Sequence, residues 1–110
     1  MYRRYELYVG DEPQGIGFLQ GISELDKDEE YLDMLTEYFD KQLAIPHHIF
    51  AEHRQTKSWF TEEGYCKFKP FIENIQQSYD ETGLFEMRCL TSNVLNDIVY
   101  QDDFQVICKI

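Results

Sequence analysis

The chain has 110 residues, of which 43% are hydrophobic and 15% aromatic, and this apolar content excludes a disordered polymer. A chain of this length fits one ordinary domain with one core, so we assign residues 1–110 to a single domain. Ten basic residues oppose 21 acidic ones, and the formal charge of -11 argues against direct binding to nucleic acid or to an anionic membrane surface, because like charges repel.

The N-terminal segment has the pattern of a strand followed by a turn. Residues 3–9 place Tyr5, Leu7 and Val9 on one side and mostly polar side chains on the other, and this period of two predicts a half-buried strand. The segment GDEPQG supplies turn residues. The short apolar run IGFLQGI, residues 16–22, predicts a second strand beside the first.

A first helix is predicted over residues 27–44, and it ends before Pro46 because a residue that precedes proline is pushed out of the helical region. The stripe opposite its apolar face is acidic. The apolar residues recur at steps of three and four and form one stripe: Tyr31, Leu32, Leu35, Tyr38, Phe39 and Leu43.

A second helix is predicted with Ser58 as its N-cap and Gly83 as its C-terminal cap. Gly64 and Pro70 fall inside its apolar pattern, so we expect a kink near residues 67–69 or a division into two pieces there. Its expected buried stripe consists of Phe60, Phe68, Phe71, Ile72, Ile75 and Tyr79.

Three strands are predicted at the C-terminal end, over residues 85–91, 97–100 and 104–110, with QDD as a hairpin connection between the last two. Strands at both ends of the chain around a helical middle indicate an α+β fold. We expect a two-layer sandwich with a mostly antiparallel sheet of four or five strands and two helices on one face. The first strand is expected to lie beside the C-terminal ones.

The apolar runs and the cysteines predict the cellular compartment of the protein. No apolar run approaches the roughly 20 residues that cross a bilayer, and the N-terminal segment lacks a secretory signal pattern, so we expect a soluble cytoplasmic protein. Cys66, Cys89 and Cys108 are odd in number and share no CxxC spacing. They fall within apolar-patterned segments, which favours buried thiols in a reducing compartment.

Residues 45–60 hold all three histidines of the chain and its only tryptophan. Histidine is a common metal ligand, but His47, His48 and His53 lack the HExxH spacing, and HIFAEH is one residue longer than HxxEH. We therefore assign no metal site and no cofactor, and we interpret these histidines as solvated or capping residues.

An alternative for the same segment is an anion pocket that needs no metal. Its donors are His47, His48, His53, Arg54, Lys57 and Ser58. Trp59 is its stacking wall, and the backbone N–H groups at the start of the second helix are expected to point to the same place. The favoured interpretation is that Trp59 and Phe60 are core aromatics, while the basic residues pair with the acidic first helix.

Neither a nucleotide-binding loop nor a nucleophile is indicated. The glycines of GIGFLQG depart by one residue from GxGxxG, and no βαβ unit follows. Cys66 and Ser58 are the thiol and the serine hydroxyl near the histidines, but nothing in their setting indicates catalysis. No catalytic residue is assigned.

Eight acidic residues lie between Glu24 and Asp40 against one lysine. Most such runs are solvated helix faces. The sharper hypothesis is that Asp33, Glu37 and Asp40 form a face that docks on a basic protein, where complementary charge accelerates encounter and salt weakens it.

The segments KSWF, residues 57–60, and DIVYQDDFQVICK, residues 97–109, resemble a pattern in a family of small uncharacterised bacterial proteins of about this length. The resemblance spans most of the chain and implies a compact single domain of bacterial type. It implies no activity, cofactor, partner or functional residue.

The preferred hypothesis is a non-enzymatic cytoplasmic domain that regulates or inhibits a more basic protein through its first helix. The alternative is a small-ligand-binding protein or enzyme with an anion pocket at residues 47–59. A third hypothesis is a homodimer that pairs through an edge strand such as residues 104–110.

Overall fold

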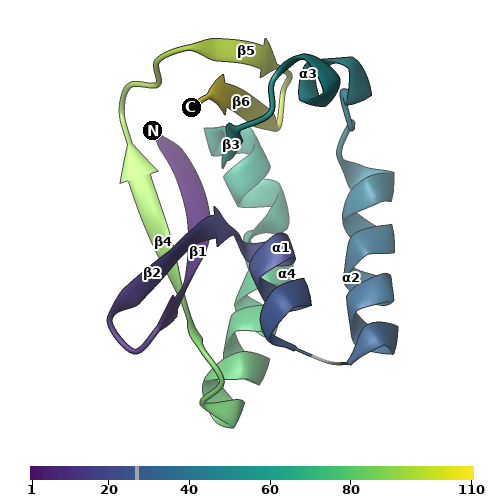
Figure 1. Cartoon of the computed structure of the whole chain (residues 1–110), viewed down its shortest axis with the longest axis vertical. Coiled ribbons are helices and arrows are strands. Elements are labelled where there is room, and N and C mark those ends of the chain that lie inside the picture. Colours follow the sequence, from purple (N-terminus) through teal and green to yellow (C-terminus); the bar gives the residue numbers. More distant parts are fainter. Residues whose placement is uncertain (27) are drawn as a thin grey trace.

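Six antiparallel strands and four helices make up the part of the chain that the structure describes, residues 1–26 and 28–110, in a computed structural model (Figure 1). In chain order the elements are β1 (Tyr2–Val9), β2 (Glu12–Gly17), α1 (Phe18–Leu25), α2 (Glu29–Gln42), α3 (His47–Glu52), β3 (Thr56–Phe60), α4 (Glu62–Thr82), β4 (Glu86–Ser92), β5 (Ile98–Gln101) and β6 (Gln105–Lys109). The predicted α+β class is confirmed, with more elements than the four or five strands and two helices expected. No helix among the described residues is both long and apolar enough to cross a membrane.

β1 is the strand around which the sheet is arranged. One of its edges pairs with β4 over nearly its full length, from Tyr2 opposite Ser92 to Tyr8 opposite Glu86, so the expected return of the C-terminal part beside the first strand is confirmed. Its other edge is shared. β2 pairs with β1 from Glu6 onwards, whereas β3 meets β1 at the single pair of Arg3 and Phe60. The sheet therefore forks on this side of β1.

The sheet continues from β3 to β6 and then to β5. β3 pairs with one edge of β6 along residues 56–60, and β5 pairs with the other edge. β6 is thus an inner strand, and the prediction of a free edge at residues 104–110 is wrong. The reason is that residues 56–60, which the sequence pattern assigned to a linker and a helix N-terminus, form the strand that covers it.

The predicted second strand at residues 16–22 is also wrong over most of its length. β2 uses the polar and glycine-containing segment before it and ends at Gly17, and α1 begins at Phe18. Phe18, Gly21 and Ile22 are buried, and their spacing of three and four residues is that of a helical face. This apolar run was too short for its period to be distinguished from that of a strand.

Ser58 is not a helix cap. It lies within β3, and α4 begins after Thr61, whose hydroxyl oxygen accepts a hydrogen bond from the Gly64 N–H at 3.0 Å. Residues 45–60 are therefore not a linker, because α3 and β3 occupy most of them. β3 is stabilised by its ladder to β6, a long-range contact that no local pattern reveals.

α4 runs without interruption from Glu62 to Thr82, so the predicted division near Pro70 is wrong. Pro70 is exposed, and four members of the predicted buried stripe lie on the opposite side: Phe68, Ile72, Ile75 and Tyr79. The other two differ from the prediction, because Phe60 belongs to β3 and Phe71 is only half-buried. The packing of this stripe outweighs the hydrogen bond that proline removes. Gly83 has φ 68°, the left-handed conformation of the predicted C-terminal cap.

The start of α4 rests on the turn between β5 and β6. The Thr61 hydroxyl donates to the Asp103 carbonyl oxygen at 2.6 Å, and the Thr61 N–H donates to the Phe104 carbonyl oxygen at 3.0 Å. Gly64 lies so close that a Cβ atom added to it would stand 2.0 Å from the Phe104 carbonyl oxygen. Only glycine fits this contact without a shift of the backbone.

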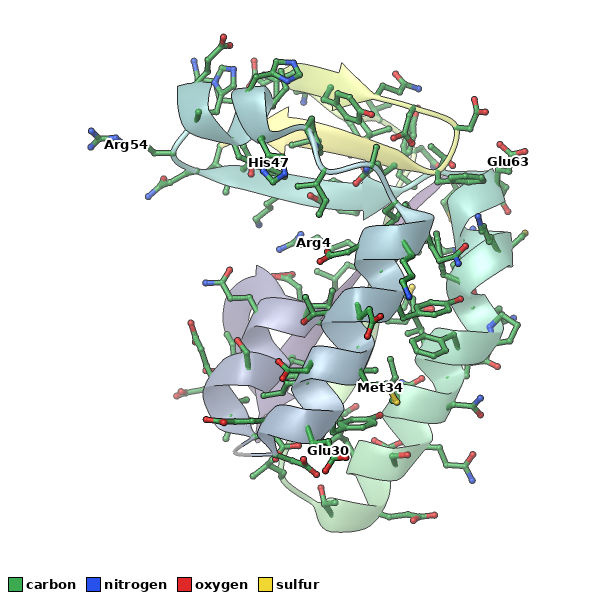
Figure 2. All side chains as sticks on the ribbon, turned by 90° about the vertical axis from the view of Figure 1, so that its right-hand side faces the viewer. Arg4, Glu30, Met34, His47, Arg54 and Glu63 are labelled. Carbon is green, nitrogen blue, oxygen red and sulfur yellow. The ribbon has the colours of Figure 1, made fainter. Side chains whose placement is uncertain are left out.

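The hydrophobic core lies between the sheet and the helices. α2 contributes Leu35 and Phe39 from its predicted stripe, and aromatic rings join it to α4: the Phe39 and Phe68 centroids are 5.5 Å apart, and Tyr38 stacks on Phe71 at 3.8 Å. Figure 2 shows α2 and α4 side by side. These contacts fix the position of the C-terminal end of α2, which borders the candidate site.

The prediction of three buried thiols holds only for Cys108, because Cys66 and Cys89 are exposed. Cys66 lies on the outer side of α4, away from the buried stripe. Cys89 lies in β4, which pairs with β1 alone among the described strands and so has an uncovered edge. Alternation along a strand predicts the face of a side chain but not whether another element covers it.

Candidate ligand-binding cleft

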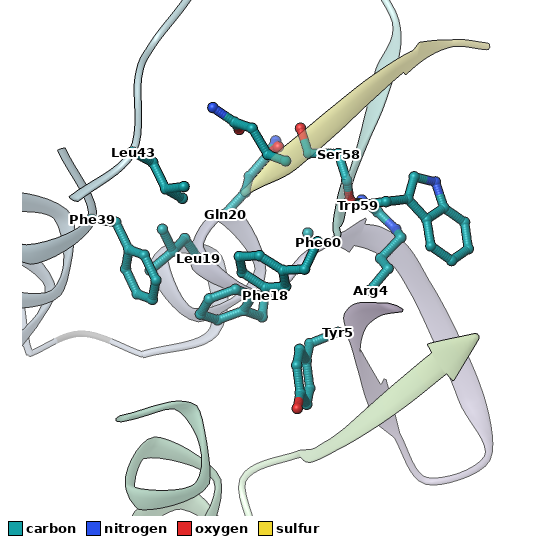
Figure 3. Close-up of a pocket in the computed structure, with 12 residues that line it drawn as sticks. Arg4, Tyr5, Phe18, Leu19, Gln20, Phe39, Leu43, Ser58, Trp59 and Phe60 are labelled. Atoms are coloured by element: carbon teal, nitrogen blue, oxygen red, sulfur yellow. Dashed lines mark hydrogen bonds between the residues drawn. The ribbon is translucent and has the colours of Figure 1, made fainter. Parts of the chain in front are cut away.

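A cleft of about 240 Å³ opens where the sheet forks, and we call it the fork cleft (Figure 3). It lies between α1, the C-terminal end of α2, and β3. Its apolar walls come from Phe18, Leu19, Phe39, Leu43 and Phe60. Its polar groups come from Arg4, Gln20, Ser58 and Gln105.

The fork itself explains why the space is open. β2 stops at Gly17 and the chain turns into α1, while β3 touches β1 only at Arg3. At Arg4 and Tyr5, no described strand pairs with this edge of β1. The side chains of Arg4 and Tyr5 leave β1 in different directions, as Figure 3 shows, and both border the fork cleft.

Arg4 is the charged residue of the fork cleft. Its side chain extends into the gap between β3 and α1 (Figure 2), and only 6% of the residue is exposed. Nη1 donates a hydrogen bond to the Ser58 carbonyl oxygen at 3.0 Å, on the edge where the β1–β3 ladder has stopped. Nε is buried and has no hydrogen-bond partner within residues 1–26 and 28–110. An arginine carries five N–H donors, so this guanidinium has donors to spare.

Glu6 compensates the charge of Arg4. It lies two residues further along β1, is 5% exposed, and its Oε1 is 3.9 Å from Arg4 Nε. Burial lowers the pKa of Arg4 and the charge of Glu6 opposes that effect; an arginine remains protonated in proteins. At an effective dielectric constant of about 20, two unit charges at this separation attract by about 4 kcal/mol, which the loss of hydration partly offsets.

The other polar residues of the fork cleft either hold its walls in place or, in the case of Trp59, provide a spectroscopic signal. Gln105 Nε2 donates to the Ala44 carbonyl oxygen at 2.6 Å and so ties β6 to the segment that follows α2. Tyr5 is buried, and burial raises the pKa of its hydroxyl, which therefore stays protonated. Trp59 borders the fork cleft as the only tryptophan of the chain, which makes its indole an unambiguous spectroscopic reporter.

The residues of the predicted anion pocket do not converge on one place. His47 and His48 are exposed on α3, and Lys57 is half-buried in β3. Ser58 and Trp59 border the fork cleft. None of these five residues lines the hollow that the remaining two predicted donors border.

His53 and Arg54 border a second hollow of about 490 Å³, which Lys109 also lines. This hollow lies at the end of α3 and beside the C-terminal end of β6. Its basic residues face open surroundings, and no buried polar group without a partner occurs among the described residues that line it.

The N-terminus of α4, which was expected in the anion pocket, is capped by Thr61 and bonded to the β5–β6 turn. α4 begins at Glu62, later than predicted, and its Thr61 cap is bonded to Asp103 in the β5–β6 turn. The first-turn N–H of Gly64 is taken by Thr61. The helix therefore does not begin at Ser58 as predicted, because residues 56–60 form a strand between α3 and α4.

The three carboxylates of the predicted docking face all lie on exposed positions of α2. Asp33, Glu37 and Asp40 are separated by four and three residues, which places them on one side of the helix. Glu37 accepts a hydrogen bond from Lys41 at 2.8 Å, and this bond lowers the pKa of the Glu37 carboxyl. Met34 is 52% exposed next to Asp33.

The sequence pattern predicts a ligand-binding role for Ser58 and Trp59 but for no other residue that lines the fork cleft. Arg4 was assigned to the polar, solvent-facing side of the first strand, and nothing in the alternation marks it as buried. Phe18, Leu19 and Leu43 were predicted to be apolar, but the gap they line depends on where β2 and β3 diverge. No local signal encodes that gap.

Among the residues that the structure describes, no group of three or more His, Cys, Asp or Glu side chains is placed to hold a metal ion. Comparisons with protein-family models, with curated proteins and with solved structures found no match to this chain.

Proposed function

We propose that the protein is a non-covalent binder of a small, mainly apolar molecule that occupies the fork cleft. The observation that carries this proposal is a buried arginine that lines an aromatic and aliphatic space and whose Nε has no hydrogen-bond partner among the described residues. Binding sites for small molecules are mostly apolar and hold a few polar groups that orient the ligand. The fork cleft has this composition.

The volume sets the size of the ligand. A dry cavity of about 150 Å³ holds a benzene molecule, so the 240 Å³ of the fork cleft suits one ring with a short substituent. Larger ligands of the size of a nucleotide need a larger site. The expected ligand is therefore a single-ring compound or a short branched aliphatic one.

The chemistry of the lining favours binding over catalysis. Its polar groups are a guanidinium, amides and hydroxyls. These groups donate and accept hydrogen bonds but do not exchange protons readily near neutral pH, and acid–base catalysis needs a group with a pKa close to the working pH. A preformed cleft with fixed walls binds its ligand at a low entropic cost.

Toluene is the probe that tests the proposal. We expect toluene to shift the single Trp59 indole N–H signal in a ¹H–¹⁵N NMR spectrum and to saturate. Gly17 lines the fork cleft with φ -62°, and an added Cβ would meet no described atom within 4 Å, so Gly17→Phe adds a ring at the border of the cleft without backbone strain. This variant should weaken toluene binding at least tenfold.

Gln14→Phe is the matched control, because Gln14 is an exposed position on the same strand and does not line the fork cleft. It should bind toluene as the native chain does. Equal toluene binding by the Gly17→Phe variant and the native chain, or no saturable binding to the native chain, would refute the proposal.

A second candidate function is the binding of a basic protein by the face of α2 that carries Asp33, Glu37 and Asp40. The observation that favours it is the exposure of Met34 beside these carboxylates, since an apolar side chain next to charges is a common feature of protein-binding surfaces. Long-range attraction to a chain of charge -11 adds to the encounter rate with a basic partner.

A further inference from the structure

We infer that the fork cleft selects a neutral hydrogen-bond acceptor, such as a ketone or ester carbonyl, over a carboxylate of the same size. This inference rests on the proposed function and adds the chemical class of the ligand. It follows from the ion pair between Arg4, which lines the cleft, and Glu6, which lies behind Arg4 and does not line the cleft.

Arg4 has a hydrogen-bond donor that lacks an acceptor. One of its N–H groups is used on the Ser58 carbonyl oxygen, while Nε has no hydrogen-bond partner in the described part of the chain and the residue is 6% exposed. A buried donor without an acceptor costs free energy that an incoming acceptor recovers. A ligand that places an oxygen atom beside the guanidinium therefore gains a charge-assisted hydrogen bond in addition to its apolar contacts.

Glu6 decides the charge of that acceptor. Its carboxylate is 3.9 Å from Arg4 Nε and equally buried, so the two residues together carry no net charge. A ligand carboxylate would bring a second negative charge next to Glu6 and would lose its own hydration. The formal charge of -11 on the chain adds repulsion at longer range. A carbonyl oxygen accepts the same hydrogen bond from Arg4 without repulsion by Glu6 and without the loss of a carboxylate's hydration.

Acetophenone and benzoate form the test pair, because both place an oxygen atom on a single aromatic ring. At pH 7 the native chain should bind acetophenone at least tenfold more tightly than benzoate, as measured by titration of the Trp59 indole N–H signal. Acetophenone, but not toluene, should also shift the Arg4 Nε–H signal in the same spectra.

The Glu6→Gln variant tests whether the charge of Glu6 causes the selection of a neutral ligand. The substitution preserves the shape of the side chain but leaves the Arg4 charge uncompensated, so benzoate binding should strengthen at least tenfold while toluene binding stays as in the native chain. The comparison of ligands in the native chain does not depend on this variant, so a failure of Glu6→Gln to fold leaves that test intact.

The results of these experiments distinguish a failure of this inference from a failure of the proposed function. Benzoate binding that equals or exceeds acetophenone binding in the native chain overturns the inference and makes the cleft an anion site. Binding of toluene and acetophenone with no change in the Arg4 Nε–H signal shows that Arg4 only clamps β3 to β1; the inference then fails and the proposed function stands. If neither toluene nor acetophenone saturates, both fail.

Discussion

The contact of Gly64 with the β5–β6 turn depends on the absence of a side chain. A Cβ at this position would lie 2.0 Å from the Phe104 carbonyl oxygen, which is backbone and cannot rotate away. Gly64→Ala should therefore lower the free energy of unfolding by roughly 2 kcal/mol or more, even though alanine favours helix formation. Urea unfolding at neutral pH measures the effect.

Glu63→Ala is the control for this prediction, because Glu63 is exposed in the same turn of α4. Its free energy of unfolding should stay within about 0.5 kcal/mol of the native value. An unfolding curve of Gly64→Ala that overlays the control would mean that α4 can move away from the turn at no cost.

Asp102 holds the same turn from the other side. Its carboxylate accepts hydrogen bonds from the backbone N–H of Phe104 at 2.8 Å and of Gln105 at 2.9 Å, and from the Tyr100 hydroxyl at 2.9 Å. Burial acts to raise the pKa of Asp102, but these hydrogen bonds outweigh it and the net pKa lies below its usual value of 3.8.

A lowered pKa in the folded state means that the Asp102 carboxylate stabilises the fold above the unfolded-state value and loses this effect as the pH falls through the folded-state value. Because the turn is only partly buried, Asp102→Asn should cost about 1 kcal/mol at pH 7. The difference from the native chain in the free energy of unfolding should shrink as the pH falls below the ordinary aspartate value of 3.8. Urea unfolding across this pH range measures it. A difference for Asp102→Asn that stays constant across this pH range would contradict the assignment.

At the scale of an element, the exposed carboxylates of α2 make a prediction about partners. Reversal of Asp33, Glu37 and Asp40 to lysine changes the formal charge by +6, from -11 to -5. If the face binds a basic protein, the native chain should capture that protein from lysate at low salt and the reversed chain should capture at least tenfold less. Quantitative mass spectrometry of the captured proteins provides the measurement.

Glu63, Asp80 and Glu81 of α4 provide the matched control, since all three are exposed acids and their reversal to lysine gives the same -5. This control should capture the partner as well as the native chain does. Equal loss in both triple variants would indicate a general charge effect, and no loss in either would leave α2 as a solvated face.

The elements also differ in how far the sequence could predict them. α2 and α4 repeat their apolar residues over several turns, and Leu35 and Phe68 are buried as this period requires. β3 is only five residues long and exists because β6 pairs with it. In the glycine-rich run after Gly15 the chain changes from strand to helix within a few residues. Neither the strand period of two nor the helical period of 3.6 residues can repeat there. Short elements are decided by tertiary contacts, which the sequence does not display.

At the scale of the whole molecule, the candidate site was predicted only where its residues carry their own signal. Trp59 and Ser58 were selected because an aromatic ring and a hydroxyl are suited to ligand binding. Arg4 looked like a solvent-facing residue, yet the single β1–β3 pair at Arg3 leaves a gap into which it turns. A site assembled from separate elements depends on the divergence of two strands, and that is a property of the assembled sheet.

The position of β1 has a consequence for the order in which this chain acquires its structure. β1 precedes every other described strand, yet its full-length partner is residues 86–92, and until these are available one edge has no strand to pair with. Pairing over such a separation forms slowly and leaves a strand edge open to other chains. The edge of β1 thus stays open to other chains until residues 86–92 dock on it, and docking then moves the open edge to β4.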